Sequence, residues 1–147
     1  MIYREEIRDL FSVPDDYYLA HCISADFALG AGIAVEFNRR FDMKRKLQEK
    51  YPNHVNEWDT YQYLGKCIVE GRVLNLVTKE RYFHKPTYES MRNALCEMES
   101  VCRWRGIKKV AMPTIGCGLD RLQFNKVSEI IQEIFADTEI EILVCRK

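Results

Sequence analysis

The 147-residue chain lacks the features that mark several specialised classes of protein. It has no apolar run close to the roughly 20 residues that a membrane span requires, and its start, MIYREE, lacks the basic and apolar regions of a signal peptide. Its 22 basic and 22 acidic residues cancel, which disfavours a broad electrostatic grip on nucleic acid or on an acidic membrane. We therefore expect a soluble, cytoplasmic protein with no membrane partner.

Metal-binding spacings are also missing. The six cysteines form no Cys-x-x-Cys pair, and the three histidines do not complete a zinc pattern. Several cysteines, such as Cys22 and Cys145, lie within apolar stretches. We expect reduced thiols that serve as small core residues, and neither a metal nor another cofactor.

No internal repeat, low-complexity segment or linker-like stretch divides the chain, so one domain over residues 1–147 is expected. The hydrophobic fraction of 47% and the charged fraction of 30% are typical of a globular protein. Hydrophobic patterns predict strands at residues 2–4, 17–23, 65–69, 73–78, 109–112 and 140–145, and helices that begin near residues 32, 43, 87 and 125. A hairpin at Glu70 and Gly71 makes the sheet mixed, and the alternation of strands and helices predicts a three-layer α/β/α fold.

Two glycine-containing segments follow buried strands, at residues 24–33 (SADFALGAGI) and 113–120 (PTIGCGLD). Each lies past the carboxyl end of its strand, where open α/β sheets bind ligands. Glycine permits positive φ and close approach, so backbone N–H groups can converge on phosphate oxygens, and a following helix adds its dipole. We predict that both loops bind one diphosphate nucleotide. The alternative is that the glycines only form tight turns.

Two common nucleotide-binding motifs do not account for these loops. Gly30 and Gly32 resemble the start of a Rossmann fingerprint, but Val35 occupies the third glycine position. A Walker loop is excluded because the sequence contains neither Gly-Lys-Ser nor Gly-Lys-Thr. The pattern favours a diphosphate nucleotide held without metal.

Segments across nearly the whole chain match one family: residues 9–11 (DLF), 19–24 (LAHCIS), 30–35 (GAGIAV), 77–79 (VTK), 84–89 (HKPTYE) and 112–123 (MPTIGCGLDRLQ). On these segments the chain resembles a macrodomain, in the branch of the terminal ADP-ribose protein glycohydrolase. Arg8 stands where the family usually has glycine, Thr114 stands where a relative has arginine, and residues 41–65 match poorly.

The resemblance implies that the protein binds ADP-ribose and, as a monomer, removes it from glutamate or aspartate esters on ADP-ribosylated protein. O-acetyl-ADP-ribose and ADP-ribosylated nucleic acid are further substrate classes that the family suggests. By position, Asp9 should accept a hydrogen bond from the adenine amino group, with the Leu10 backbone beside it. The residues implied to line the distal ribose and phosphates are Ser24, Gly30, Ala31, Gly32 and Ile33, and those implied to wrap the pyrophosphate are Thr114, Ile115, Gly116, Cys117, Gly118 and Leu119.

The resemblance also implies that Lys79 is the nucleophile and Asp120 its acid–base partner. An unperturbed lysine is neutral in only roughly one molecule in a few thousand at pH 7, and a nearby carboxylate favours the ammonium form. Asp120 would therefore have to take the proton during attack on the anomeric carbon. A second scheme stays open, in which Asp120 activates water and protonated Lys79 stabilises the departing carboxylate.

Two further hypotheses compete with this one. A reader module would bind ADP-ribose through the glycine loops and Asp9 and would not need Lys79 or Asp120. Alternatively, Cys117 could act as a nucleophile, because a thiol between two glycines near a helix start can have a lowered pKa. His21 and His84 are interpreted as structural residues.

Overall fold

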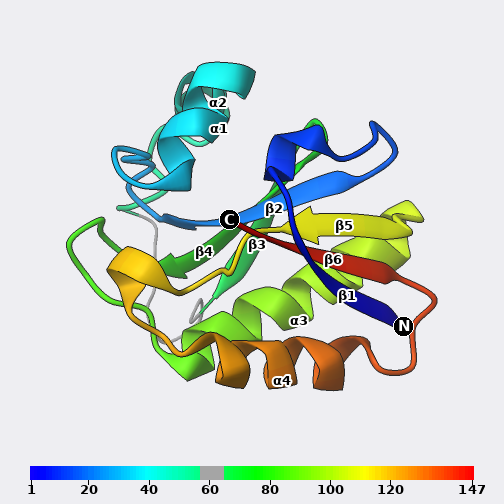
Figure 1. Cartoon of the computed structure of the whole chain (residues 1–147). Coiled ribbons are helices and arrows are strands. Elements are labelled where there is room, and N and C mark those ends of the chain that lie inside the picture. The colour runs from blue at the N-terminus through cyan, green and yellow to red at the C-terminus, as the bar shows by residue number, and fades with distance from the viewer. Residues whose placement is uncertain (57–64) are drawn as a thin grey trace.

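The computed structural model describes residues 1–56 and 65–147, with the side chain of Leu119 excepted (Figure 1). A six-stranded sheet with the order β1-β6-β5-β2-β4-β3 forms the middle layer. Its strands are β1 (Ile2–Ile7), β2 (Tyr18–Ser24), β3 (Lys66–Glu70), β4 (Val73–Lys79), β5 (Lys109–Met112) and β6 (Glu141–Arg146). The β3–β4 hairpin is antiparallel, and the remaining pairs are parallel, which confirms the predicted mixed sheet.

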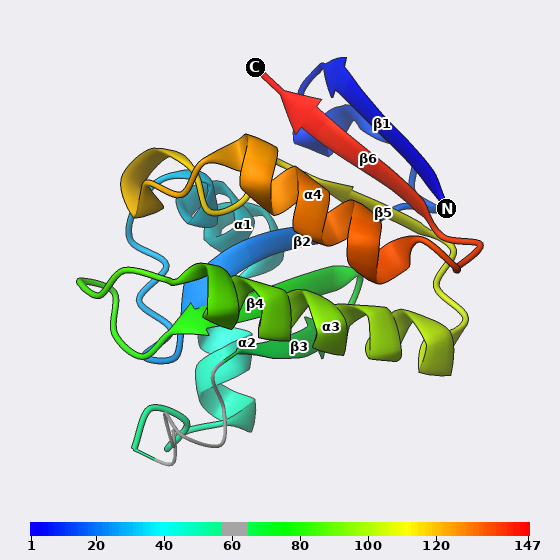
Figure 2. The same ribbon diagram turned by 90° about the horizontal axis from the view of Figure 1, so that it is seen from below.

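Helices cover both faces of this sheet. The helices α3 (Tyr88–Arg105) and α4 (Phe124–Phe135) lie side by side on one face (Figure 2). The helices α1 (Ile33–Phe41) and α2 (Met43–Lys50) lie on the other, and two short 3-10 turns, η1 (Leu10–Ser12) and η2 (Gly118–Asp120), complete the fold. The predicted three-layer α/β/α architecture is confirmed. In the described ranges, no helix is both long enough and apolar enough to cross a membrane.

The core consists of two apolar layers, one on each face of the sheet. Strand β2 contributes to both, because Leu19 and Ile23 pack on the α1–α2 side while Ala20 packs on the α3–α4 side. The helix α3 buries an apolar stripe whose fully buried members include Met91, Leu95, Met98 and Cys102. Burial of each large apolar side chain stabilises the fold by about 1.5–3 kcal/mol.

Residues at the two ends of α3 determine where this helix begins and ends. Thr87 Oγ1 accepts a hydrogen bond from the Ser90 N–H, and Ser90 Oγ accepts one from the Thr87 N–H, each at 3.0 Å. This capping box begins the helix, and Gly106, in the left-handed region at φ 67°, ends it.

The first strand is longer than predicted. β1 continues to Ile7 because its backbone pairs in register with β6, from Ile2 opposite Glu141 to Ile7 opposite Arg146. It is an edge strand with mostly exposed side chains, so its polar residues carry no hydrophobic pattern.

The pairing of β2 with β4 shifts register after Ile23, close to the carboxyl ends of both strands. Across the shift Ser24 pairs with Lys79, and the Ala25 N–H donates to the Lys79 carbonyl at 2.9 Å. The carboxyl ends of β2 and β4 therefore lie side by side, and the loops that follow these two strands start next to each other.

Candidate active site

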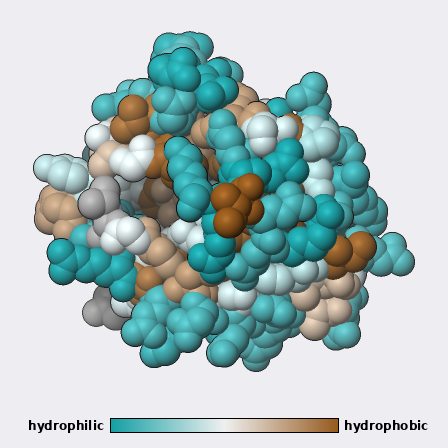
Figure 3. Space-filling view, in the orientation of Figure 1, coloured by the Kyte–Doolittle hydropathy of each residue, from teal (hydrophilic) through white to brown (hydrophobic). Residues whose placement is uncertain are grey.

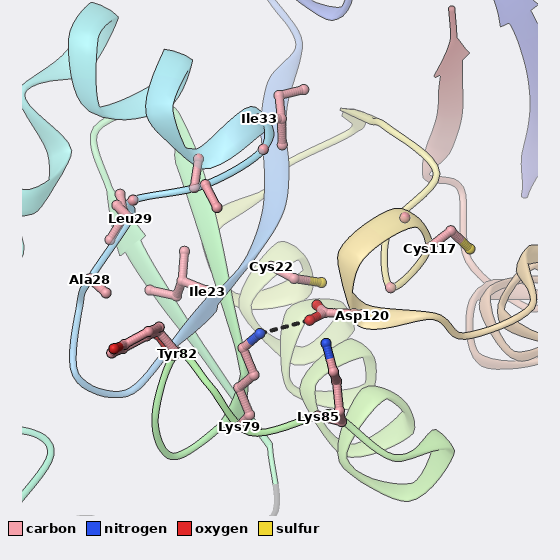
Figure 4. Close-up of a pocket in the computed structure, with 17 residues that line it drawn as sticks. Cys22, Ile23, Ala28, Leu29, Ile33, Lys79, Tyr82, Lys85, Cys117 and Asp120 are labelled. Atoms are coloured by element: carbon pink, nitrogen blue, oxygen red, sulfur yellow. Dashed lines mark hydrogen bonds and ion pairs between the residues drawn. The ribbon is translucent and has the colours of Figure 1, made fainter.

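A pocket of about 790 Å³ opens at the carboxyl ends of β2 and β4, between the loop before α1 and the turn η2 (Figure 4). Figure 3 shows this face of the molecule hollowed, with apolar atoms in the depth of the hollow. The lining residues are Cys22, Ile23, Ser24, residues 28–34, Lys79, Tyr82, Lys85, residues 116–118 and Asp120. Both glycine loops that the sequence singled out therefore line one pocket.

Lys79 and Asp120 meet inside this pocket. Lys79 lies at the last position of β4 and Asp120 at the last position of η2, and Lys79 Nζ donates to Asp120 Oδ1 at 2.7 Å. The two side chains are only 14% and 16% exposed. In Figure 4 the side chain of Lys85 also extends toward Asp120. An amine and a carboxylate in direct hydrogen bond can exchange a proton without an intervening water.

The segment around η2 holds Asp120 in place. Arg121 adopts a left-handed conformation at φ 63°, and its N–H donates to the Gly118 carbonyl at 3.2 Å. The Leu122 N–H donates to the Gly116 carbonyl at 2.7 Å. These bonds close a compact turn that presents the carboxylate to Lys79.

The loop before α1 is organised by Asp26, which sequence analysis did not single out. Asp26 Oδ1 accepts from Ser24 Oγ at 2.5 Å and from the Ala28 N–H at 3.2 Å. Asp26 Oδ2 accepts from the Tyr82 N–H at 3.0 Å, so one carboxylate ties this loop to the loop that follows Lys79. The bond to the Ala28 N–H, two residues on, is an Asx turn, which is the only sequence signal that could have found Asp26.

The N-terminus of α1 opens into the pocket. Gly32 is the N-cap at φ 61°, and a Cβ at this position would meet no atom within 4 Å. Within the described part of the chain, no hydrogen bond engages the N–H groups of Gly30, Ala31 or Gly32. These donors and the positive end of the helix dipole suit an anion.

The second glycine loop uses its two glycines differently. At Gly116 the backbone φ of 77° favours glycine, and an added Cβ would also lie 2.8 Å from Met91 Cε, at the flexible end of that side chain. At Gly118, with φ 83°, the same atom would enter open space. The N–H groups of Ile115 and Cys117 donate to carbonyls within the loop, at 2.8 and 3.3 Å.

Several residues implied by the family resemblance lie outside the pocket lining. Asp9 is exposed and caps η1, where its Oδ1 accepts from the Phe11 N–H at 3.0 Å, while Leu10 is buried in the core. Thr114 is half-buried and Ile115 is buried. The backbone of Leu119 belongs to η2, and its side chain is outside the described part of the structure.

Arg8 and residues 41–65 are the places where the sequence departs from the family. Arg8 donates from its Nε to Ser12 Oγ at 3.2 Å and from a terminal nitrogen to the Ser12 carbonyl at 3.1 Å. These two bonds hold the end of η1. Of the poorly matching segment, residues 57–64 lie outside the described residues.

Two thiols line the pocket without the properties of a nucleophile. Burial, reinforced by the charge of Asp120, raises the pKa of Cys22 to about 12. Burial also raises the pKa of Cys117, whose Sγ lies 3.6 Å from the Ile115 carbonyl oxygen and points away from the Lys79–Asp120 pair in Figure 4. A reactive thiol needs a lowered pKa, so the structure disfavours nucleophilic catalysis by Cys117. Within the described residues, no group of three or more His, Cys, Asp or Glu side chains is arranged to hold a metal ion.

Comparison with known proteins places the chain in a family. No family model matches the sequence. Over 137 residues the chain is 43% identical to the ADP-ribose glycohydrolase OARD1 of Bos taurus, a match that covers 92% of this chain and 86% of that protein. The fold superposes on the macrodomain of Thermus aquaticus DarG with a TM-score of 0.81, at 21% identity over 99% of both chains. It also superposes on Thermosipho africanus DarTG in complex with ADP-ribose, with a TM-score of 0.70 at 18% identity over 94% of this chain and 39% of that one. The chain belongs to the macrodomain family, in the branch of the ADP-ribose glycohydrolase OARD1.

Proposed function

We propose that the protein is an ADP-ribosyl hydrolase that releases ADP-ribose from glutamate or aspartate esters. The observation that carries this proposal is the 2.7 Å contact between Lys79 Nζ and Asp120 Oδ1, inside a pocket that both glycine loops line. The activity named for the relative OARD1 and the ADP-ribose bound by DarTG support the same conclusion.

The glycine loops would hold the diphosphate through backbone donors. The N–H groups of residues 30–32 and the N-terminus of α1 offer hydrogen bonds and a positive dipole to the two negative charges. The open space beside Gly118 lets an oxygen approach the second loop closely. This arrangement would position the distal ribose beside Lys79 and Asp120.

In the first chemical step, Lys79 attacks the anomeric carbon of the distal ribose. Its Nζ transfers a proton to Asp120 across their hydrogen bond, and its lone pair forms a C–N bond as the bond from carbon to the ester oxygen breaks. The acceptor side chain departs as a carboxylate.

In the second step, water releases the sugar. As the C–N bond breaks, the amine leaves with the bonding electrons and takes the proton of Asp120, and the resulting carboxylate accepts a proton from water as the water oxygen bonds to the anomeric carbon. Free ADP-ribose results, and loss of this last proton from Asp120 to solvent regenerates the Lys79–Asp120 pair. The direct contact favours this covalent route over water attack alone, because Asp120 is already engaged with the amine.

A turnover assay with matched variants tests the proposal. The wild-type protein should release free ADP-ribose from a glutamate-ADP-ribosylated peptide. Lys79→Ala and Asp120→Ala should each lower kcat by about a hundredfold or more, the range expected for loss of a general base or nucleophile, while calorimetry shows retained ADP-ribose binding. Lys108→Ala, an exposed lysine just before β5, is the control and should behave as wild type.

The same assay separates this proposal from a reader module. A reader would bind ADP-ribose with no release of product by the wild-type protein. Normal hydrolysis by both Lys79→Ala and Asp120→Ala would show that the catalytic assignment is wrong.

A further inference from the structure

A tight turn beside the pocket displays two aromatic side chains to solvent. Tyr82 and Phe83 are 66% and 62% exposed, and their rings pack edge to face with centroids 5.3 Å apart. Exposed aromatic side chains gathered at one place are typical of recognition surfaces. The proposed hydrolysis of the ester assigns no role to Phe83.

The backbone of this turn is fixed by hydrogen bonds. The His84 N–H donates to the Arg81 carbonyl at 3.0 Å, and the Arg81 N–H donates to His84 Nδ1 at 3.3 Å. Asp26 accepts from the Tyr82 N–H, which anchors the turn to the loop that lines the pocket. The ring of His84 also packs against Phe83, with centroids 4.7 Å apart. A preorganised surface loses little conformational entropy when it binds a partner.

The position of the turn indicates which part of the substrate contacts it. Tyr82 and Lys79 both line the pocket, and Phe83 follows Tyr82 in the chain. If the distal ribose lies at Lys79, the group esterified to its anomeric carbon must leave through the open side of the pocket, where this turn stands. The inference therefore rests on the proposed function.

We infer that the turn at residues 81–84 is an acceptor subsite for a peptide, in which Phe83 binds an apolar side chain that neighbours the modified glutamate or aspartate. An aromatic face buries such a side chain favourably, and Tyr82 continues the same surface into the pocket. The subsite would favour esters on a polypeptide over small acyl esters of ADP-ribose.

A peptide suits this surface better than a nucleic acid. Proteins that stack bases on aromatic platforms usually combine them with a positively charged groove along the phosphate backbone. This chain has a net charge of zero, and of the basic residues beside the turn, Lys79 is paired with Asp120 and Lys85 extends toward the same carboxylate in Figure 4.

The test compares three substrates. Two are glutamate-ADP-ribosylated peptides that carry either leucine or serine next to the modified glutamate, and the third is O-acetyl-ADP-ribose with its acetyl group on the anomeric oxygen, which has no peptide. The wild-type kcat/KM should be about tenfold higher for the leucine peptide than for the serine peptide. Phe83→Ser should abolish the preference for the leucine peptide and leave hydrolysis of O-acetyl-ADP-ribose unchanged. Phe83→Leu should keep most of the preference for the leucine peptide. Trp104→Ser, which removes an 87% exposed aromatic side chain from the far end of α3, should match wild type.

Several results would overturn the inference. These are equal rates for the two peptides in the wild type, a preference that survives Phe83→Ser, or an equal loss on O-acetyl-ADP-ribose. An ADP-ribosylated oligonucleotide, assayed as a fourth substrate, tests the other occupant: a Phe83→Ser defect confined to it would assign the subsite to nucleic acid instead. Hydrolysis of O-acetyl-ADP-ribose without peptide preference would overturn the subsite alone, while no turnover of any substrate would overturn the proposed function with it.

Discussion

Mild acid should destabilise the fold through His21, a fully buried side chain on β2. The imidazole stacks on Phe37 with centroids 3.8 Å apart, and its Nε2 lies 2.7 Å from Asn75 Oδ1. Asn75 Nδ2 donates to the Ile68 carbonyl at 3.1 Å, so Oδ1 is the atom that faces His21, and Nε2 must carry the proton. A second proton would have to bind Nδ1, which is buried without a hydrogen-bond partner in the described structure.

The size of the effect follows from the pKa of His21. Burial lowers this pKa from 6.5 to about 4, although the hydrogen bond that His21 donates to Asn75 opposes the shift. Between these two values the unfolded chain binds more protons than the folded chain, so stability is lost as pH falls from 6.5 toward 4. Linkage gives a loss of about 2 kcal/mol between pH 7.5 and pH 5 from this one group.

Urea denaturation at pH 7.5 and pH 5 measures the loss. His21→Gln is the matched variant, because its amide can still donate to Asn75 and does not titrate, while all carboxyl groups remain the same. The wild-type protein should lose about 2 kcal/mol more unfolding free energy than His21→Gln over this pH interval. Equal losses in the two proteins would refute a neutral, buried His21.

Three further outcomes are expected. Gly118→Val should weaken ADP-ribose binding by about tenfold or more in calorimetry, because φ 83° strains a branched residue and its side chain would fill the open space; unchanged affinity would exclude this loop from the binding site. Thr87→Ala should lower the unfolding free energy by about 1 kcal/mol in urea denaturation, through loss of the α3 cap, without changing kcat. Cys117→Ala should hydrolyse the glutamate-ADP-ribosylated peptide at the wild-type rate, and a large fall in kcat would revive the thiol hypothesis.

The sequence predicts the fold well where local chemistry determines it. The helix start predicted near residue 87 and the hairpin predicted at Glu70 and Gly71 are both confirmed. It does not predict the full length of β1, because this edge strand is held by backbone pairing with β6, which lies more than 130 residues away in the chain.

The candidate site is predictable only in part, for a related reason. The glycine loops could be found because positive φ and strand ends leave a local signature. The bond from Tyr82 to Asp26 joins residues 56 positions apart, and the contact of Lys79 with Asp120 spans 41 positions. Such contacts depend on the register shift between β2 and β4, which no local pattern reveals.

The central claim is that Lys79 attacks the sugar with Asp120 as its proton acceptor. Intact-mass spectrometry of protein quenched in acid during turnover of a glutamate-ADP-ribosylated peptide tests this claim most directly. A species heavier by one ADP-ribose unit, mapped to Lys79 and absent from Lys79→Ala, is the predicted result. Rapid release of ADP-ribose with Lys79 unmodified at every time point, and undiminished release by Lys79→Ala, would contradict it.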